Sequence, residues 1–133
     1  MELFANKYIG LPYKAGFFDC WGLVRKVYKE EYGINLQEIP IDVENLRQLI
    51  TIIDQTSERN NWERVTIPDE GDIVLMRQSR HPIHVGIWLN ADGGGVVHCI
   101  KNSGVVFQDL NNLILSGWKI EGFYKYAKSH NPS

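Results

Sequence analysis

The sequence predicts an α+β fold in which helices come first and strands follow. Apolar residues recur at helical spacing in the first third of the chain, and the second half is rich in short β-branched and aromatic runs. Such segregation along the chain is typical of α+β folds rather than of alternating βαβ units. The 133 residues suit one hydrophobic core, so we predict a single domain over residues 1–133.

The first predicted elements are a short helix, a loop and a longer helix that begins at a cysteine. The opening MELFANKYIG can form a helix that ends at Gly10, and the Pro and Gly of LPYKAGFF are typical of a loop. Asp19 is a suitable N-cap for a helix that starts at Cys20, and Gly33 is a suitable stop. The apolar face of this helix consists of Leu23, Val24, Val27, Tyr28 and Tyr32. The thiol of Cys20 is therefore expected in the first turn.

The segment from about residue 34 to residue 68 reads as a helical or loop insertion. It holds one amphipathic helical pattern and then the polar run DQTSERNN. The apolar positions of the pattern are Val43, Leu46, Ile50 and Ile53. At the other end of the chain, residues of about 128–133 form a short polar tail, which we expect to be disordered together with its His130.

Five strands are predicted after the insertion, and the second and third of them form a hairpin. The strand-like runs are GDIVLM, IHVGIWL, GVVHCI, GVVFQ and WKIEGFYKY. The turn NADGGG is rich in residues that tolerate positive φ. If its centre lies near Ala91, His84 and His98 are cross-strand neighbours on one face, and Cys99 points to the opposite face as a core residue.

Composition argues against several classes of partner. The 14 basic and 16 acidic residues nearly balance and no Lys/Arg-rich run is present, so we expect no nucleic-acid partner. No apolar run is long enough to insert into a membrane, and the first residues lack the pattern of a secretory signal, which predicts synthesis in the cytoplasm. Cys20 and Cys99 are the only cysteines, and in a reducing compartment we expect both to be free thiols.

One cysteine and two histidines form a candidate catalytic set. A helix N-terminus directs unpaired N–H groups toward the sulfur of Cys20, which favours the thiolate. In this hypothesis His84 takes the thiol proton to form a thiolate–imidazolium pair, and His98 orients the His84 ring. Backbone N–H groups at the helix start stabilise the oxyanion. The predicted reaction is acyl transfer to water, and it requires no cofactor.

The same residues carry a resemblance to a known family. PYKAG, FDCWGLV, GDIVLM, HVGIWL and VVHC resemble, in this order, the motifs of the NlpC/P60 cysteine peptidases, which share a papain-like core. The resemblance extends from about Leu11 to Gly122 and implies cleavage of the peptide stems of bacterial peptidoglycan, typically after a γ-linked D-glutamate. It implies Cys20 as the nucleophile, His84 as the base, His98 as the orienting residue and Tyr13 as a residue that binds substrate or assists at the oxyanion.

Two features connect the chain with the branch of the family that is encoded with phage tail genes. DCWGLVRKVY and the later GFYKY look most like that branch, in which Trp21 takes the place of a common serine. The loop KAGFFDC is shorter than in most of the family. A tail enzyme reaches the wall from outside, so the absence of a signal pattern fits a protein made in the host cytoplasm and incorporated in the virion tail. Other tail-tip proteins are then expected partners.

Several alternatives remain open at the level of sequence. The chain could be a catalytically silent structural protein of the tail tip, or an amidase or acyltransferase on the same core. A zinc site is a further alternative, because nitrogen and sulfur ligands suit that ion. Its ligands would be His81, His84, His98 and Cys99. Individually, Cys20 can be a small core residue and Tyr13 can simply pack over the first helix.

Overall fold

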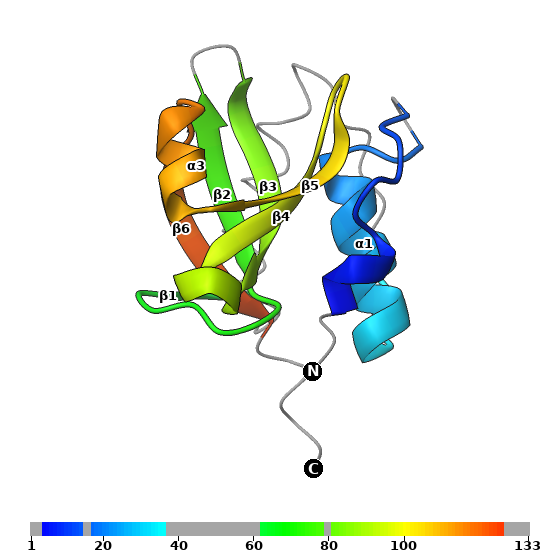
Figure 1. The fold of residues 1–133 in the computed structure, drawn as a ribbon. Helices are drawn as coiled ribbons and strands as arrows, with labels where there is room; N and C mark the ends of the chain where they lie inside the picture. Colours follow the sequence, from blue (N-terminus) through cyan, green and yellow to red (C-terminus); the bar gives the residue numbers. More distant parts are fainter. Residues whose placement is uncertain (1–3, 15–16, 37–61, 79–80, 127–133) are drawn as a thin grey trace.

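The computed structural model describes residues 4–14, 17–36, 62–78 and 81–126. Within them a helix packs on a six-stranded antiparallel sheet, so the predicted α+β class is confirmed (Figure 1). The strands follow the order β1-β6-β2-β3-β4-β5 across the sheet. The elements are η1 (Phe4–Lys7), α1 (Cys20–Tyr32), β1 (Trp62–Val65), β2 (Ile73–Gln78), β3 (His81–Leu89), η2 (Ala91–Gly93), β4 (Gly95–Ile100), β5 (Gly104–Asp109), α3 (Leu110–Leu115) and β6 (Lys119–Tyr126).

Helix α1 begins and ends where the sequence predicts. The side chain of Asp19 accepts a hydrogen bond from the backbone N–H of Gly22 at 2.8 Å, which caps the first turn. At the other end Gly33 adopts a left-handed conformation, with a φ of 68°, and its N–H bonds to Lys29 O. These two caps place Cys20 in the first turn of the helix.

The sheet has a buried cluster on each face. On the first face α1 packs against strand residues of odd number, namely Ile73, Leu75, Val85, Ile87, Leu89, Val97, Cys99 and Val105. The second cluster comprises residues of even number in the first strands together with residues from α3 and its neighbourhood, namely Val74, Met76, Trp88, Val96, Leu113 and Trp118. This alternation follows from the period of two in a strand. Figure 1 accordingly shows α1 and α3 on opposite sides of the sheet.

Two described elements were not predicted. Strand β1 lies inside the segment assigned to the insertion, where only Trp62 of its four residues is buried, so its pattern is too short to recognise. It pairs with β6 at the edge of the sheet. Helix α3 has six residues and buries only Leu113, and its N-cap is Asp109. At the N-terminus the predicted short helix is a 3-10 helix. The amphipathic helix predicted around residues 43–53 and the polar tail lie outside the described residues.

The β3–β4 hairpin differs in register from the prediction. Ile87 pairs with Val97, and the ladder continues toward the turn through Trp88 and Leu89. A regular extension of this register would place His84 opposite Ile100, two residues from the predicted partner His98. Because the difference is an even number of residues, both histidines keep the predicted face.

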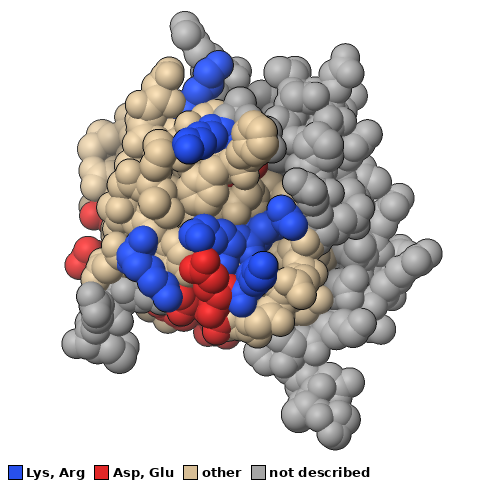
Figure 2. Space-filling model, turned by 90° about the vertical axis from the view of Figure 1, so that its right-hand side faces the viewer, with Lys and Arg blue, Asp and Glu red and all other residues tan. Residues whose placement is uncertain are grey.

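The surface over α1 carries a mixture of charges. Figure 2, which views the molecule from the side where α1 lies in Figure 1, shows basic and acidic groups close together. Lys7 pairs with Glu31 at 2.6 Å, and Lys26 pairs with Glu30 at 2.8 Å. In the described part of the chain, no helix combines the length and apolarity that a membrane span needs.

Candidate active site

Two histidines from neighbouring strands are in direct contact. His84 lies on β3 and His98 on β4, and their Nε2 and Nδ1 atoms are 2.9 Å apart. The rings meet edge to face with centroids separated by 5.0 Å. His84 is 7% exposed and His98 is fully buried. The expectation that these side chains lie within reach of one another on one face is therefore met, although the register that suggested it was not the observed one.

Two further side chains complete the environment of this pair. Trp118 stacks on the His84 ring at a centroid distance of 4.7 Å and meets His98 edge-on at 5.6 Å. Gln108 lies on β5, and its Oε1 is 2.8 Å from Nε2 of His98. Sequence reasoning missed both contacts. The β4–β5 hairpin, with its turn near Gly104, could have revealed Gln108. Val106 pairs with His98, and Gln108 follows Val106 by two residues, so Gln108 lies on the same face as His98.

Cys20 lies near the backbone of β3, close to His84 in the sequence of that strand. The N–H of Val85, the residue that follows His84, lowers the pKa of the Cys20 thiol. The thiol therefore lies where the β3–β4 ladder has ended, because the first paired residue of β3 is Ile87. Cys20 is only 4% exposed. Helix α1 thus brings its first residue to the strand segment that carries His84.

Burial and the helix N-terminus have opposite effects on the pKa of the Cys20 thiol. Burial raises the pKa of Cys20 to about 12, and the charge of Asp19 acts in the same direction, whereas the N–H groups of Val85 and Trp21 act against it. Loss of hydration outweighs the helix N-terminus because almost no solvent reaches the sulfur. Burial therefore acts against the predicted thiolate–imidazolium pair, which stays a prediction.

Burial also decides the charge of His98. It lowers the pKa of His98 to about 4, although the hydrogen bond with Gln108 acts in the opposite direction. At neutral pH this imidazole is uncharged, so one ring nitrogen donates a hydrogen bond and the other accepts one. A neutral His98 can therefore receive a hydrogen bond from His84.

Tyr13 and Cys99 belong to the surroundings of Cys20. Tyr13 is partly buried against the cluster that contains Cys20, and burial raises the pKa of its hydroxyl, with smaller effects from Asp19 and the two cysteines. Cys99 is fully buried on the α1 face, as predicted. Its thiol donates to the carbonyl of Phe18 at 3.7 Å, so it holds the loop that leads into α1.

Two residues of the alternative zinc site, His98 and Cys99, lie on opposite faces of the sheet. Cys99 lies in the α1 cluster, whereas Trp118, against which His98 packs, lies in the cluster on the other face of the sheet. Over the ranges that the structure describes, no group of three His, Cys, Asp or Glu residues is placed to hold a metal ion.

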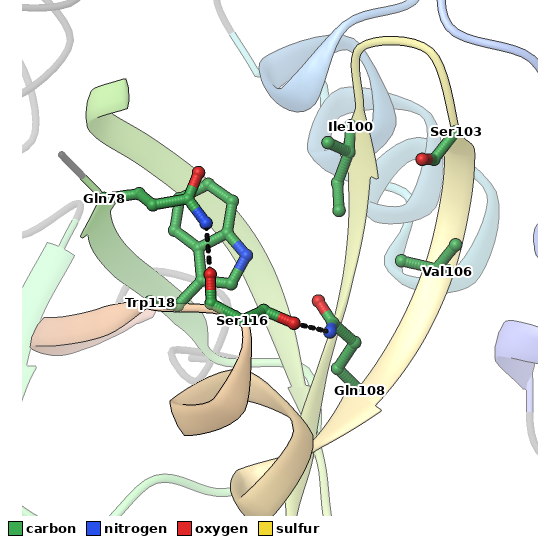
Figure 3. Close-up of a pocket in the computed structure, with 7 residues that line it drawn as sticks. All are labelled: Gln78, Ile100, Ser103, Val106, Gln108, Ser116 and Trp118. Carbon is green, nitrogen blue, oxygen red and sulfur yellow. Dashed lines mark hydrogen bonds between the residues drawn. The ribbon is translucent and has the colours of Figure 1, made fainter. Parts of the chain in front are cut away.

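A pocket of about 370 Å³ borders the histidine pair. Figure 3 shows Trp118 and Gln78 on one side of it and the β4–β5 hairpin on the other, with Gln108 and Ser116 between them. Its lining residues, none of which carries a charge, are Gln78, Ile100, Ser103, Val106, Gln108, Ser116 and Trp118. Trp118 and Gln108 also contact the histidines, so the pocket and the candidate site share a wall.

A helix that begins at a cysteine and packs on an antiparallel sheet carrying a histidine pair defines a papain-like α+β protein. Residues 10–121 match the model of the NlpC/P60 family, and the chain belongs to this family. It is also 34% identical over 91 residues to the tail tip assembly protein K of Escherichia phage N15. That match covers 65% of this chain and 37% of the phage protein, so the chain spans well under half of this relative.

Proposed function

We propose that this protein is a cysteine endopeptidase that hydrolyses the peptide stems of bacterial peptidoglycan as a component of a phage or prophage tail. Membership of the NlpC/P60 family supports the chemistry, and the similarity to a tail tip assembly protein supports the location. The observation that carries the proposal is the contact of the Cys20 thiol with the backbone of Val85, next to the hydrogen-bonded pair of His84 and His98.

In the proposed reaction Cys20 attacks the carbonyl carbon of the scissile amide. Because burial raises the pKa of the resting thiol, His84 accepts its proton as the carbon–sulfur bond forms. Backbone N–H groups at the start of α1, with Tyr13 nearby, stabilise the negative oxygen of the tetrahedral intermediate. Protonated His84 then donates to the departing amine, and the acyl group stays on sulfur as a thioester. Water activated by His84 hydrolyses the thioester and restores the thiol.

The proposed site of action follows from the proposed partners. The substrate is the peptide stem of the wall, and the neighbours in the particle are other tail-tip proteins. The chain would be synthesised in the host cytoplasm, enter the virion tail during assembly and reach the wall when the tail meets a cell. Neither nucleic acid nor membrane lipid is a proposed partner.

Digestion of purified peptidoglycan tests the activity. We expect the wild-type protein to release peptide fragments that mass spectrometry identifies, and Cys20→Ala and His84→Ala to release none. Cys99→Ala is the matched control, because it removes the other buried cysteine without touching the proposed nucleophile, and it should still release the fragments. If wild type and Cys20→Ala give identical muropeptides, the enzyme is excluded.

The second candidate is a structural tail protein that keeps the fold without catalysis. The name of the relative, an assembly protein, and the buried thiol of Cys20 with its raised pKa favour it. It predicts that wild type leaves peptidoglycan intact while binding tail-tip proteins. An amidase or acyltransferase on the same core would instead separate the stem from the sugar or transfer the acyl group to an amine, and the fragment masses distinguish these products.

A further inference from the structure

A chain of hydrogen bonds continues outward from the histidine pair. The Nε2 of Gln108 donates to the hydroxyl of Ser116 at 2.9 Å, and the Oε1 of the same amide faces Nε2 of His98 at 2.8 Å. His98 in turn contacts His84 through its Nδ1 at 2.9 Å. Figure 3 shows the outer part of this chain at the wall of the pocket. Three hydrogen bonds, through the side chains of Gln108 and His98, therefore link the exposed residue Ser116 to the ring of His84.

The chain of hydrogen bonds specifies where each proton of the two histidines lies. A carbonyl oxygen only accepts, so Nε2 of His98 carries a proton and donates it to Gln108. His98 is neutral at neutral pH, because burial lowers its pKa to about 4, and its Nδ1 is therefore an acceptor. It follows that Nε2 of His84 donates to His98. In neutral His84 the lone pair is then on Nδ1, which can accept a proton from a thiol.

We propose that Gln108 is a positioning residue that sets the proton positions of both histidines, so that Nδ1 of His84 is the basic nitrogen of the site. This rests on the proposed function in so far as a base is needed there. Gln108 acts through His98 and contacts neither the nucleophile nor the reacting bond. The reversed amide would make Nδ1 of His98 the donor, Nε2 of His84 the acceptor and Nδ1 of His84 a donor, which cannot accept a proton.

The surroundings of Gln108 favour the observed orientation. Ser116 follows α3 as its C-cap, and its backbone carbonyl accepts from Nε2 of Gln78 at 2.5 Å. Its own N–H bonds to Asn112 O at 3.0 Å. The side chain of Gln78 on β2 and the end of α3 thus hold Ser116 in place. The hydroxyl of Ser116 accepts the hydrogen bond from the Gln108 amide on β5. Figure 3 shows both side chains directed at Ser116 from opposite sides.

An uncharged acceptor has an advantage over a carboxylate at this position. A carboxylate beside His98 would favour the imidazolium and raise the pKa of this ring. An imidazolium donates from both nitrogens, so it could no longer accept from His84. The amide of Gln108 orients His98, and burial keeps the ring neutral although the hydrogen bond with Gln108 raises its pKa.

Nitrogen-15 NMR of the histidine rings tests the proposal without any substrate. In the wild type at pH 7 we expect both His84 and His98 to be protonated at Nε2. In Gln108→Met, which retains the length of the side chain, the His98 proton should lose protection from solvent exchange and the population of His84 protonated at Nδ1 should rise. Gln108→Glu should keep the wild-type proton positions and move the titration of His98 upward from about pH 4.

Kinetics supply a second readout if peptidoglycan is cleaved. Gln108→Met should lower kcat about tenfold with little change in KM, as expected for loss of one buried hydrogen bond to the base system. Gln108→Glu should lose activity as the pH falls through the raised pKa of its His98, because the protonated ring can no longer accept a hydrogen bond from His84. Circular dichroism and thermal melting establish that each variant is folded.

Gln78→Met is the matched control for the NMR experiment. It removes a glutamine amide that contacts Ser116 but neither histidine, and we expect the histidine signals to stay as in the wild type. Protonation of wild-type His98 at Nδ1 would overturn the proposal, as would unchanged proton positions in a folded Gln108→Met. Absence of hydrolysis by the wild type would instead contradict the proposed function and leave the NMR result standing.

Discussion

His98 illustrates how burial determines the chemistry of one residue. Its ring is fully buried between β4, β5 and Trp118, and its pKa falls to about 4. The ordinary value is 6.5. The unfolded chain therefore binds a proton between these two values and the folded chain does not. Above pH 6.5 this group does not affect the free energy of unfolding. As the pH falls from 6.5 toward 4, the free energy of unfolding must decrease.

The first prediction concerns the pH dependence of stability. Between pH 7 and pH 4 the free energy of unfolding of the wild type should fall by about 3 kcal/mol more than that of His98→Gln, which has no titrating ring. Urea unfolding of both proteins at several pH values measures the difference. Parallel curves for the two proteins would show that His98 titrates normally in the folded state.

The second prediction concerns the thiols. The pKa of Cys20 and that of Cys99 are both raised to about 12 by burial. At pH 7 iodoacetamide should therefore modify Cys20 more than about a hundredfold more slowly than a free cysteine, since the thiolate is the nucleophile. Timed alkylation followed by mass spectrometry, with the denatured protein as control, measures the rate. Rapid and selective modification of Cys20 at pH 6 would instead establish the thiolate–imidazolium pair.

At the scale of elements, the site lies where the β3–β4 ladder ends. The two strands pair only from Ile87 to Leu89, and beyond this ladder Val85 contacts the first residue of α1. Gly86 lies between the paired and unpaired parts. A Cβ at this position would be 2.9 Å from Val97 O and 3.0 Å from Cβ of His98, and closer still to Val96. The absence of a side chain therefore allows the close approach that brings the histidines together.

The third prediction tests this approach. Gly86→Ala should destabilise the fold by about 1–3 kcal/mol and lower the proposed activity, because β3 must move away from the backbone of β4. Gly122→Ala on β6 is the matched control. Its Cβ would meet the Arg64 guanidinium at 3.2 Å, a flexible group that can yield, and the loss should stay below about 1 kcal/mol. Chemical denaturation compares them, and equal losses would argue against a special role of Gly86.

At the scale of the whole molecule, a small catalytic fold is proposed to work inside a larger assembly. The match covers 37% of the tail tip assembly protein K of phage N15, so most of that protein lies outside the match. Wall cleavage and tail assembly are the two tasks proposed for the chain. Within this chain, the uncharged pocket and the histidine pair lie on the face that also carries α3 and Trp118. On the opposite α1 face Lys7 pairs with Glu31 and Lys26 pairs with Glu30, and Figure 2 shows basic and acidic groups close together there.

The fourth prediction separates the two tasks in a phage that encodes this chain. Cys20→Ala should leave tail morphology and particle yield unchanged, because the substitution is small and buried. Infection of cells with an intact wall should fall, and enzymatic thinning of the wall should restore it. Electron microscopy and plating efficiency measure these effects. Normal infection by the variant would favour the structural role.

The sequence by itself determined the α+β class, helix α1 with both caps, the central strands and the face on which each histidine lies. These features depend on local periodicity and on capping residues such as Asp19 and Gly33, which act within a few positions along the chain. The short edge strand β1 and the helix α3 had too few buried residues to produce such a pattern.

Only the tertiary structure decided the contacts and the charges of the candidate site. Trp118, which precedes β6, and Gln108 on β5 both contact the histidines, and the register of β3 and β4 came from the whole hairpin rather than from its turn residues. The burial of Cys20 was likewise decided by packing. Its helix position favours a thiolate, but burial by the surrounding elements raises the pKa, and hydration depends on the complete fold.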